Sequence, residues 1–338
     1  MTPEAATAEK PEVAGTAPRV PGRLFDADGD DRDVTVTLEL VEKIDERQTL
    51  WVDLTDPDDA TVDAVAALWG LSPVTVQKVR AGAESPHVTA FDSYLHLFVT
   101  TVEVDDDAER TARLAIIVGP NVVITVHAES LAFLDAYQDH LRGDTAIGLI
   151  DGPAFVAVLL DWLLSGYFHA VERLEEEADQ LDHRALDPRS EQDLLADLVR
   201  LRRRISGLRR ALTPHREVFA ALARPQLTGL GDPDDEPQFR ALADRLERAI
   251  AAVETARELV LGSFDVHMSR TAQRTNDVMK LLTLVTVILL PSSVIAGIMG
   301  MNFRVEFFDQ STWFWVVIGA MVLIAGATLV LARLRRWI

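Results

Sequence analysis

Residues Asn276–Asn302 read NDVMKLLTLVTVILLPSSVIAGIMGMN, and no charged side chain occurs between Lys280 and Arg304. A helix needs roughly 20 predominantly apolar residues to cross the hydrocarbon core of a bilayer, and this run is long enough. A second uncharged run, between Asp309 and Arg333, follows after a short connection. The two runs predict a transmembrane helical hairpin with spans at about residues 280–301 and 311–332.

The composition limits what kind of protein this is. With 338 residues, the chain is long enough for a large soluble part in addition to the hairpin. Its formal net charge of −20 argues against a nucleic-acid-binding protein, which needs a basic surface to neutralise phosphates. The absence of cysteine excludes disulfides and thiolate metal sites. The sequence also lacks an HExxH pattern, a phosphate-binding glycine loop and a nucleophile elbow, so we expect neither an enzyme nor a bound cofactor.

The basic residues that flank the two runs predict how the hairpin is oriented. They precede the first run and follow the second: Arg270, Arg274, Lys280, Arg333, Arg335 and Arg336. Because positively charged flanks stay on the cytoplasmic side, we expect both termini in the cytoplasm and a multi-pass protein of the cell (inner) membrane. Residues 1–24 contain no apolar signal core and are rich in Ala, Pro and Thr, so we expect a disordered tail there.

Residues 25–145 predict an α/β domain of mixed sheet and short helices. Alternation of apolar and polar residues predicts strands at Val34–Leu40 and Thr49–Leu54. The segment Asp56–Asp59 predicts the start of one helix, and Leu71–Pro73 predicts its end and the start of the next. Further strands are expected at 93–100, 112–118 and 121–127, and a further helix at about 130–141.

Two features of this domain look like metal sites but are interpreted otherwise. The four aspartates of residues 26–31 surround Gly29, but this glycine comes too early for a calcium loop, and Thr37 stands where the bidentate glutamate belongs. We interpret the segment as a solvated acidic turn. His96 and His127 occur singly in predicted strands, without a second ligand at metal-binding spacing, so we expect local hydrogen bonds to satisfy each.

Residues 146–275 predict helices throughout. An acidic helix at about 156–186 precedes a basic helix at about 190–208. We interpret the two as an antiparallel pair held by interhelix ion pairs rather than as an anion site. A third helix starts near Pro237 and meets no proline before Pro291, which predicts a stalk that continues into the first membrane span.

Polar and small residues recur along one face of the first span. Steps of three and four residues place them on one stripe of a helix: Asn276, Met279, Thr283, Thr286, Leu290, Ser293 and Gly297. Two spans cannot enclose a polar path, so the stripe predicts a path surrounded by several copies of the chain. The alternative is that the hydroxyls bond back to their own helix while the small residues pack against neighbours.

Pro291 interrupts the backbone hydrogen bonds of the first span. It leaves the carbonyl of Val287 without its helical partner, and water or the hydroxyl of Thr286 or Ser292 would satisfy that carbonyl. The second span is more uniformly apolar and begins with two tryptophans at residues 313 and 315, so we expect it to face lipid.

Several motifs occur together in an order that is characteristic of one family. The first span contains NDVMKLLT at 276–283, Pro291, AGI at 296–298 and GMNF at 300–303, and a basic tail follows the second span. Upstream motifs are WVDL at 51–54, ITVH at 124–127 and LRRALTPHRE at 208–217. In this arrangement, over about residues 30–338, the chain resembles the CorA family of divalent-cation channels.

This resemblance implies an architecture and an activity. The fold would be an α/β cytoplasmic domain with long stalk helices and a two-helix C-terminal transmembrane hairpin, assembled as a funnel-shaped homopentamer. It would conduct Mg²⁺, and often Co²⁺ and Ni²⁺, driven by the membrane potential. The residues Gly300, Met301 and Asn302 would form the selectivity filter, where neutral amide oxygens hold an ion that sheds its water reluctantly. Further inward, Asn276 would bind a hydrated ion, while Met279, Leu282 and Leu290 would narrow the pore.

The chain departs from the family pattern at two places. The outer loop reads RVEFFD at 304–309, where one arginine accompanies Glu306 and Asp309 and weakens the concentration of cations at the mouth. The carboxylate that would sense cytoplasmic Mg²⁺ falls near 241–244, where Asp244 is the candidate. Two alternatives therefore stay open: a ZntB-like zinc transporter with proton coupling, and a membrane-anchored sensor or scaffold that conducts nothing.

Overall fold

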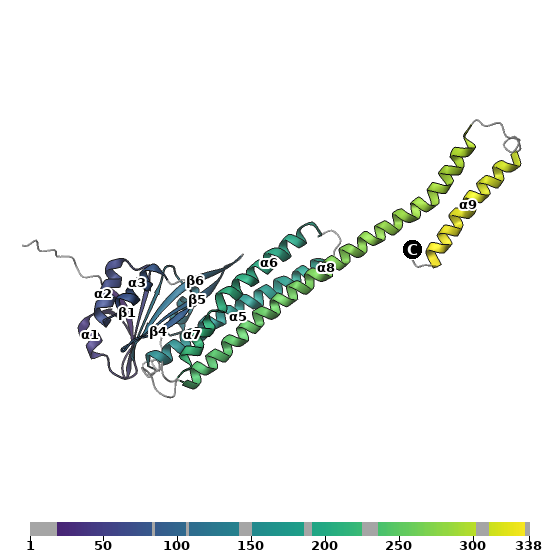
Figure 1. Cartoon of the computed structure of the whole chain (residues 1–338). Helices are drawn as coiled ribbons and strands as arrows, with labels where there is room; N and C mark the ends of the chain where they lie inside the picture. The colour runs from purple at the N-terminus through teal and green to yellow at the C-terminus, as the bar shows by residue number, and fades with distance from the viewer. Residues whose placement is uncertain are drawn as a thin grey trace, which may run out of the picture. The chain divides into compact units, whose positions relative to one another are not determined.

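A computed structural model describes residues 19–82, 85–105, 108–141, 151–185, 191–224, 236–301 and 311–334. It contains two compact units, Met1–Leu261 and Gly262–Ile338. The first unit holds the sheet and most of the helices, and the second holds the end of α8 (Glu236–Met299) together with α9 (Ser311–Leu334). The chain therefore combines an α/β part, a long helix and apolar C-terminal helices (Figure 1).

Seven strands of the first unit form one mixed sheet in the order β2-β1-β3-β7-β6-β5-β4. Their bounds are Val20–Asp26, Arg32–Val36, Gln48–Thr55, His87–Ala90, Leu95–Asp105, Ala108–Val118 and Val122–His127 for β1 to β7. β3 and β7 are parallel, with Leu50 opposite Val122, whereas the other neighbouring strands are antiparallel. The expected mixed sheet is thus confirmed.

Strand β2 ends earlier than the alternating pattern predicts. We expected a strand over Val34–Leu40, but β2 stops at Val36 and helix α1 (Leu38–Lys43) follows. The Thr37 side chain caps this helix by accepting a hydrogen bond from the Leu40 amide at 3.3 Å. Leu38 is 55% exposed. No buried face therefore enforced the alternation there, and the local helix cap determined the structure instead.

Strand β1 lies partly within the segment expected to be a disordered tail. Its first residues pair with β2 alone, because pairing with β3 begins at Arg23. Pro21 is thus placed where one side of the strand needs no amide donor. A Cβ on Gly22 would lie 3.0 Å from Val36 and 3.2 Å from Leu50, so the glycine permits this close packing. The expectation of disorder is therefore wrong for residues 20–24, which strand pairing orders.

Helices cover both faces of the sheet (Figure 1). Helices α2 (Asp59–Trp69) and α3 (Pro73–Ala81) start within the segments predicted, with Asp58 and Ser72 as their caps. They pack with α1 on the face that carries Leu50 and Val52. The other face carries Trp51 and is covered by α4 (Ala132–His140) and the helices that follow it. Adjacent residues of β3 thus enter different cores, as the period of two along a strand requires.

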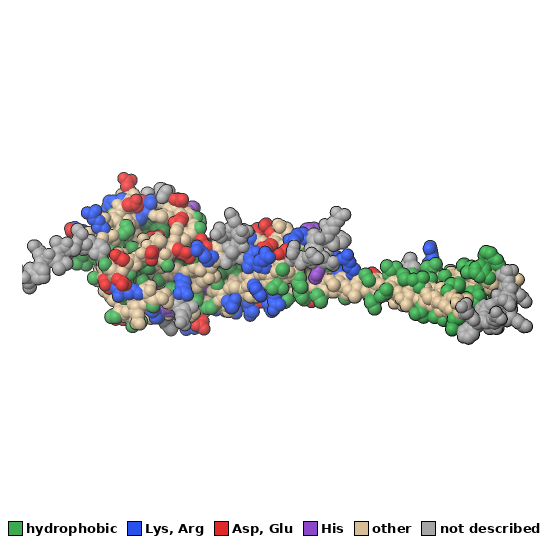
Figure 2. All heavy atoms as spheres, turned by 90° about the horizontal axis from the view of Figure 1, so that it is seen from above, with side chains coloured by type: hydrophobic (Ala, Val, Ile, Leu, Met, Phe, Trp, Pro, Cys, Tyr) green, Lys and Arg blue, Asp and Glu red, His purple; other side chains and the backbone are tan. Residues whose placement is uncertain are grey.

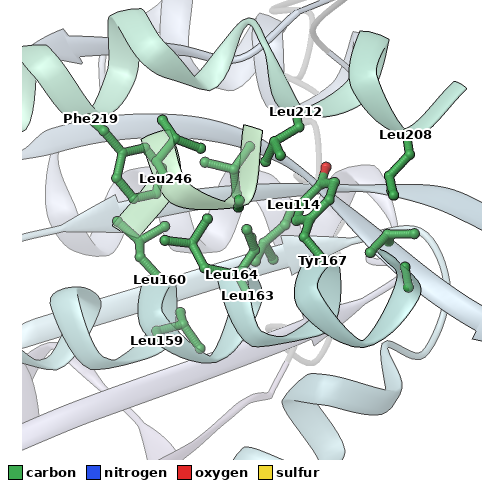
Figure 3. Packing of buried hydrophobic residues seen from close by; sticks show 14 of the residues in the cluster. Leu114, Leu159, Leu160, Leu163, Leu164, Tyr167, Leu208, Leu212, Phe219 and Leu246 are labelled. Carbon is green, nitrogen blue, oxygen red and sulfur yellow. The ribbon is translucent and has the colours of Figure 1, made fainter. Parts of the chain in front are cut away.

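The larger core joins β6 to four helices (Figure 3). These are α5 (Gly152–Ala185), α6 (Glu191–Leu212), α7 (His215–Leu222) and the first part of α8. Tyr167 of α5 is fully buried there, and its hydroxyl donates to the carbonyl of Thr100 at 2.9 Å. This core attaches the start of the long helix to the sheet.

Ion pairs confirm that α5 and α6 are antiparallel. Arg204 of α6 pairs with Glu177 of α5, and Asp197 of α6 pairs with Arg184 of α5. The second pair lies seven residues earlier on α6 and seven residues later on α5, so the two helices run in opposite directions. Arg209 of α6 instead reaches Glu254 of α8 at 2.6 Å. These groups are partly exposed, so each pair contributes at most about 1 kcal/mol. The pairs align the helices, while the apolar core supplies most of their stability.

Candidate functional site at the apolar end of α8

Three described helices are long and apolar enough to cross a membrane: α5, α8 and α9. In α5, 56% of the most apolar window is buried within the first unit, against 6% in α8 and 0% in α9. Helix α5 is therefore a core helix, whereas the apolar surfaces of α8 and α9 lack a covering layer. Figure 2 shows hydrophobic side chains over much of the visible face of the second unit. The two helices coincide with the spans expected from the sequence.

Each of these two helices has one strip of less exposed residues. On α8 the strip consists of Leu284, Ile288, Pro291, Ser292, Ile295 and Met299, and on α9 of Val317, Met321, Ile324, Ala325, Thr328 and Ala332. Both strips have the same steps of 4, 3, 1, 3 and 4 residues, which place each strip on a single helix face. We infer that the two helices pack along these strips, within the second unit, where α9 runs beside α8 (Figure 1).

The stripe predicted to line a path lies on the opposite face of α8. At 100° per residue its members fall within an arc of roughly 120°, centred about 180° from the strip. All eight predicted residues are exposed: Asn276, Met279, Leu282, Thr283, Thr286, Leu290, Ser293 and Gly297. A single chain therefore gathers these residues on one face and leaves that face uncovered.

Two threonines of the stripe bond back to their own helix. The hydroxyl of Thr283 donates to the Met279 carbonyl, and that of Thr286 donates to the Leu282 carbonyl, each at 2.8 Å. Back-bonding satisfies the hydroxyl hydrogen without water, which explains how threonine is tolerated in an apolar helix. The remaining lone pairs of both oxygens stay available to a ligand on the exposed face.

The hydroxyls near Pro291 do not satisfy the carbonyl of Val287. Ser292 donates to the Ile288 carbonyl at 3.0 Å, and Thr286 is bonded as described above. The expectation that one of these hydroxyls replaces the lost helical bond is therefore wrong. Each hydroxyl reaches the carbonyl four residues before it, which is the geometry that a helix offers. Water is then the partner expected for Val287.

The motif predicted to form the filter begins where α8 ends. The amides of Gly300 and Met301 donate to the carbonyls of Ala296 and Ile298 at 3.0 and 3.2 Å. A Cβ on Gly300 would meet its nearest atom at 3.4 Å, an ordinary contact, so one chain alone does not require glycine there. Met301 is half-exposed. Three further predicted residues lie outside the described residues: Asn302, Glu306 and Asp309.

No single-chain metal site is present among the described residues, because they contain no group of three or more His, Asp or Glu side chains that could hold an ion. Asp244, the candidate regulatory ligand, is exposed on α8. In the acidic turn, Asp26 accepts from the amide of Asp28, and Asp28 binds the guanidinium of Arg47 at 2.5 Å. The segment forms a turn between β1 and β2, as expected.

The two strand histidines differ. His127 is held by Asp53 at 3.0 Å and by the Glu129 carbonyl at 2.6 Å, as expected. Burial is the largest single effect and lowers the pKa of His127, but the hydrogen bonds with Asp53 and the Glu129 carbonyl and the charges of Asp53 and Asp135 together raise it overall. For His96 the expectation is wrong, because neither ring nitrogen has a hydrogen-bond partner within the described part of the chain. Burial lowers the pKa of His96 to about 4.

Comparison with known proteins relates this arrangement to characterised transporters. Residues 46–336 match the family described as CorA-like Mg²⁺ transporter protein. The chain is 27% identical to the cobalt/magnesium transport protein CorA of Thermotoga maritima, over 85% of this chain and 83% of that protein. It is also 24% identical to the zinc transport protein ZntB of an Enterobacter species, over 86% of this chain and 88% of that protein.

A solved structure shares the whole fold. The complete structure of the CorA magnesium transporter from Methanocaldococcus jannaschii aligns with a TM-score of 0.76 and 22% sequence identity. The alignment covers 94% of this chain and 99% of that chain. At this identity the likeness establishes the fold, including the long helix and the apolar C-terminal helices.

Proposed function

Because this chain belongs to the CorA-like Mg²⁺ transporter family, which transports divalent cations across membranes, we propose that it conducts hydrated Mg²⁺, with Co²⁺ and Ni²⁺ as further ions. One observation carries the proposal beyond family membership. The polar and small stripe of α8 lies opposite the strip packed against α9 and is exposed along its whole length. A face of this kind is costly in lipid but suits a water-filled path.

A path requires several copies of the chain. Two helices cannot surround a hydrated ion, so the exposed faces of α8 from neighbouring copies would line a common axis, in a homopentamer as the family resemblance implies. Helix α9 would then lie on the lipid side. Gly297 supports this arrangement, because a Cβ there would meet no atom within 4 Å in a single chain. Because glycine has no side chain, the α8 helices of neighbouring copies could approach one another closely at this position.

Selectivity is assigned to the filter at Gly300, Met301 and Asn302. Mg²⁺ holds its water tightly, so a ring of Asn302 amide oxygens would recognise the hydrated ion without removing its shell. Asn276 would hold the hydrated ion at the inner end, and the apolar Met279, Leu282 and Leu290 would form a constriction that gates by dewetting. Asp244 would contribute to a regulatory ion site between copies, and Glu306 and Asp309 would attract cations at the mouth.

The driving force is the membrane potential. With both termini in the cytoplasm and the protein in the cell membrane, a divalent ion moving inward gains about 4.6 kcal/mol per 100 mV. No bound cofactor and no catalytic step are needed. The α/β domain and the helices at 146–275 would lie in the cytoplasm.

The decisive experiment is Mg²⁺ uptake by proteoliposomes that contain wild-type or Asn302→Ala protein. The variant is expected to lose uptake, whereas Asn121→Ala, the same substitution in the soluble unit, should retain it. Wild-type flux in Asn302→Ala would exclude the assigned filter. Absence of flux in the wild type itself would instead favour the non-conducting sensor or scaffold.

The similarity to ZntB motivates one alternative, a proton-coupled zinc transporter. The outer loop of this chain also bears on the choice of ion, because the arginine at 304 weakens the attraction of cations at the mouth. Uptake of Mg²⁺ and Zn²⁺, each measured with and without a pH gradient at constant potential, separates the two functions. Mg²⁺ flux that is indifferent to the gradient supports the proposal, and Zn²⁺ flux that requires the gradient supports the alternative.

A further inference from the structure

A basic groove lies in the first unit between the sheet and α6. We define it by Thr100 of β5, Thr111 and Arg113 of β6, and Arg203, Gly207 and Arg210 of α6. Its volume is about 630 Å³, within the range of pockets that bind small molecules, roughly 300–1,000 Å³. The groove residues belong to the first unit, whereas the apolar end of α8 belongs to the second.

Three of the four arginines that line the groove, Arg113, Arg203 and Arg210, have no acidic partner among the described residues. The neighbouring Arg204 and Arg209 each bind a glutamate of another helix, as the sequence interpretation of interhelix ion pairs requires. Arg203 and Arg113 make no ion pair in the described part of the chain, and Arg210 donates only to a backbone carbonyl. The interpretation therefore holds for Arg209 and for Arg204, which also lines the groove, and fails for Arg203 and Arg210.

Unpaired arginines are unexpected in so acidic a chain. The formal net charge is −20, and 53 acidic residues are available to neutralise 33 basic ones. Gathering like charges around one groove is unfavourable unless an anion offsets the repulsion. Such an arrangement attracts anionic ligands and raises their local concentration.

Gly207 supplies an independent observation. It lies inside α6, where glycine costs about 1 kcal/mol relative to alanine. Packing does not demand this glycine, because a Cβ there would meet no atom within 4 Å. Arg203 and Arg210 lie four residues before and three residues after it, on the same helix face. The missing side chain leaves the floor of the groove open between two guanidinium groups.

We propose that the basic groove binds a polyphosphate group, a di- or triphosphate in its metal-free form. Each planar guanidinium group can donate two parallel hydrogen bonds to phosphate oxygens. A chloride ion or a single carboxylate has too few acceptor atoms to bind three guanidinium groups in this way. The hydroxyls of Thr100 and Thr111 add further donors. The described lining contains no aromatic side chain for stacking a base, so recognition is directed to the phosphates. Mg²⁺ bound to the polyphosphate would neutralise two of the negative charges that the arginines recognise.

Calorimetric titration of the full-length protein in detergent, at physiological ionic strength, tests this site. The probes are inorganic tripolyphosphate and ATP, which present the same triphosphate group without and with a nucleoside. Both are expected to bind with similar affinity, and an excess of Mg²⁺ should weaken both several-fold. Arg203→Gln and Arg210→Gln should each weaken binding about 10-fold or more, because each removes charge-assisted hydrogen bonds.

Matched variants separate binding from folding. Arg202→Gln removes the same charge from the neighbouring exposed position outside the groove and should leave the affinity unchanged. Gly207→Ala should retain binding and raise the thermal stability, whereas Gly207→Leu should block the groove while leaving every arginine in place. The proposal is overturned if tripolyphosphate does not bind, if Arg203→Gln binds as tightly as Arg202→Gln, if Gly207→Leu binds like the wild type, or if Mg²⁺ leaves the affinity unchanged.

Discussion

Replacing the buried His96 with leucine is expected to make the first unit less sensitive to acid. The side chain is 1% exposed on β5, and neither ring nitrogen has a hydrogen-bond partner among the described residues. Burial lowers the pKa of His96 from 6.5 to about 4, because the charged form would lose its solvation. The folded unit therefore keeps this imidazole neutral at pH values where the unfolded chain binds a proton.

The sign and size of the effect follow from proton linkage. A folded-state pKa below the unfolded one means that stability is fully present above about pH 6.5 and is lost as the pH falls toward about 4. Well inside that window each pH unit lowers the free energy of unfolding by about 1.4 kcal/mol, so His96 accounts for a loss of roughly 2–3 kcal/mol between pH 7 and pH 4.5. His215 is also fully buried, with its pKa lowered to about 4 by the same cause, and adds a similar loss. Together these losses are a large part of the roughly 5–15 kcal/mol that stabilises a domain.

Urea unfolding of the full chain in detergent, followed by tryptophan fluorescence at pH 7 and pH 4.5, measures this loss. His96→Leu should lose about 2–3 kcal/mol less than the wild type between the two pH values. At pH 7 it should be at least as stable as the wild type, because leucine removes two buried nitrogens that lack partners. His183→Leu, at an exposed position of α5, is the control and should follow the wild type. Equal losses in His96→Leu and the wild type would refute the reasoning.

Three further measurements probe the second unit, the surface and the core. Because the chain contains no cysteine, a thiol reagent should block Mg²⁺ uptake through Thr286→Cys on the stripe but not through Leu323→Cys on α9, and the reverse result would contradict the assigned face. A double-mutant cycle on Arg216 and Glu247, which are 49% and 53% exposed, should give a coupling of about 0.5–1 kcal/mol. The hydrogen bond with Arg216 lowers the pKa of Glu247, so the coupling should vanish as acid protonates that carboxylate, and a coupling that persists would exclude this cause. Phe155→Ala should lower the free energy of unfolding by about 3–5 kcal/mol, measured in urea, and a loss below about 1 kcal/mol would show that its core site can collapse.

Local features of the fold could be predicted from the sequence because their causes are local. The length of the apolar runs predicted both membrane-length helices, and α8 begins where Pro237 indicated and continues through Pro291. Asp58 and Ser72 cap the helices expected, since a cap depends on amides two or three residues away. These relations involve neighbours along the chain, and the sequence contains them directly.

Features that depend on distant residues could not be predicted. Strands β1 and β4 acquire their structure from pairing with β3 and β5, which no local pattern encodes. The environment of His96 is set by the elements packed over β5. The same holds for the arginines of α6, because only the packing of α5, α6 and α8 determines which of them reach a glutamate.

The apolar end of α8 shows the division most clearly. Residue spacing alone determined that Asn276, Thr283, Thr286 and their companions share one face, because the helix rotates by 100° per residue. It did not determine whether that face would be covered. The tertiary structure decided this by placing α9 against the strip around Leu284 and leaving the polar stripe exposed on the opposite side. The reason is physical: a second helix packs where apolar side chains interlock, and the remaining face is left for water or for another copy.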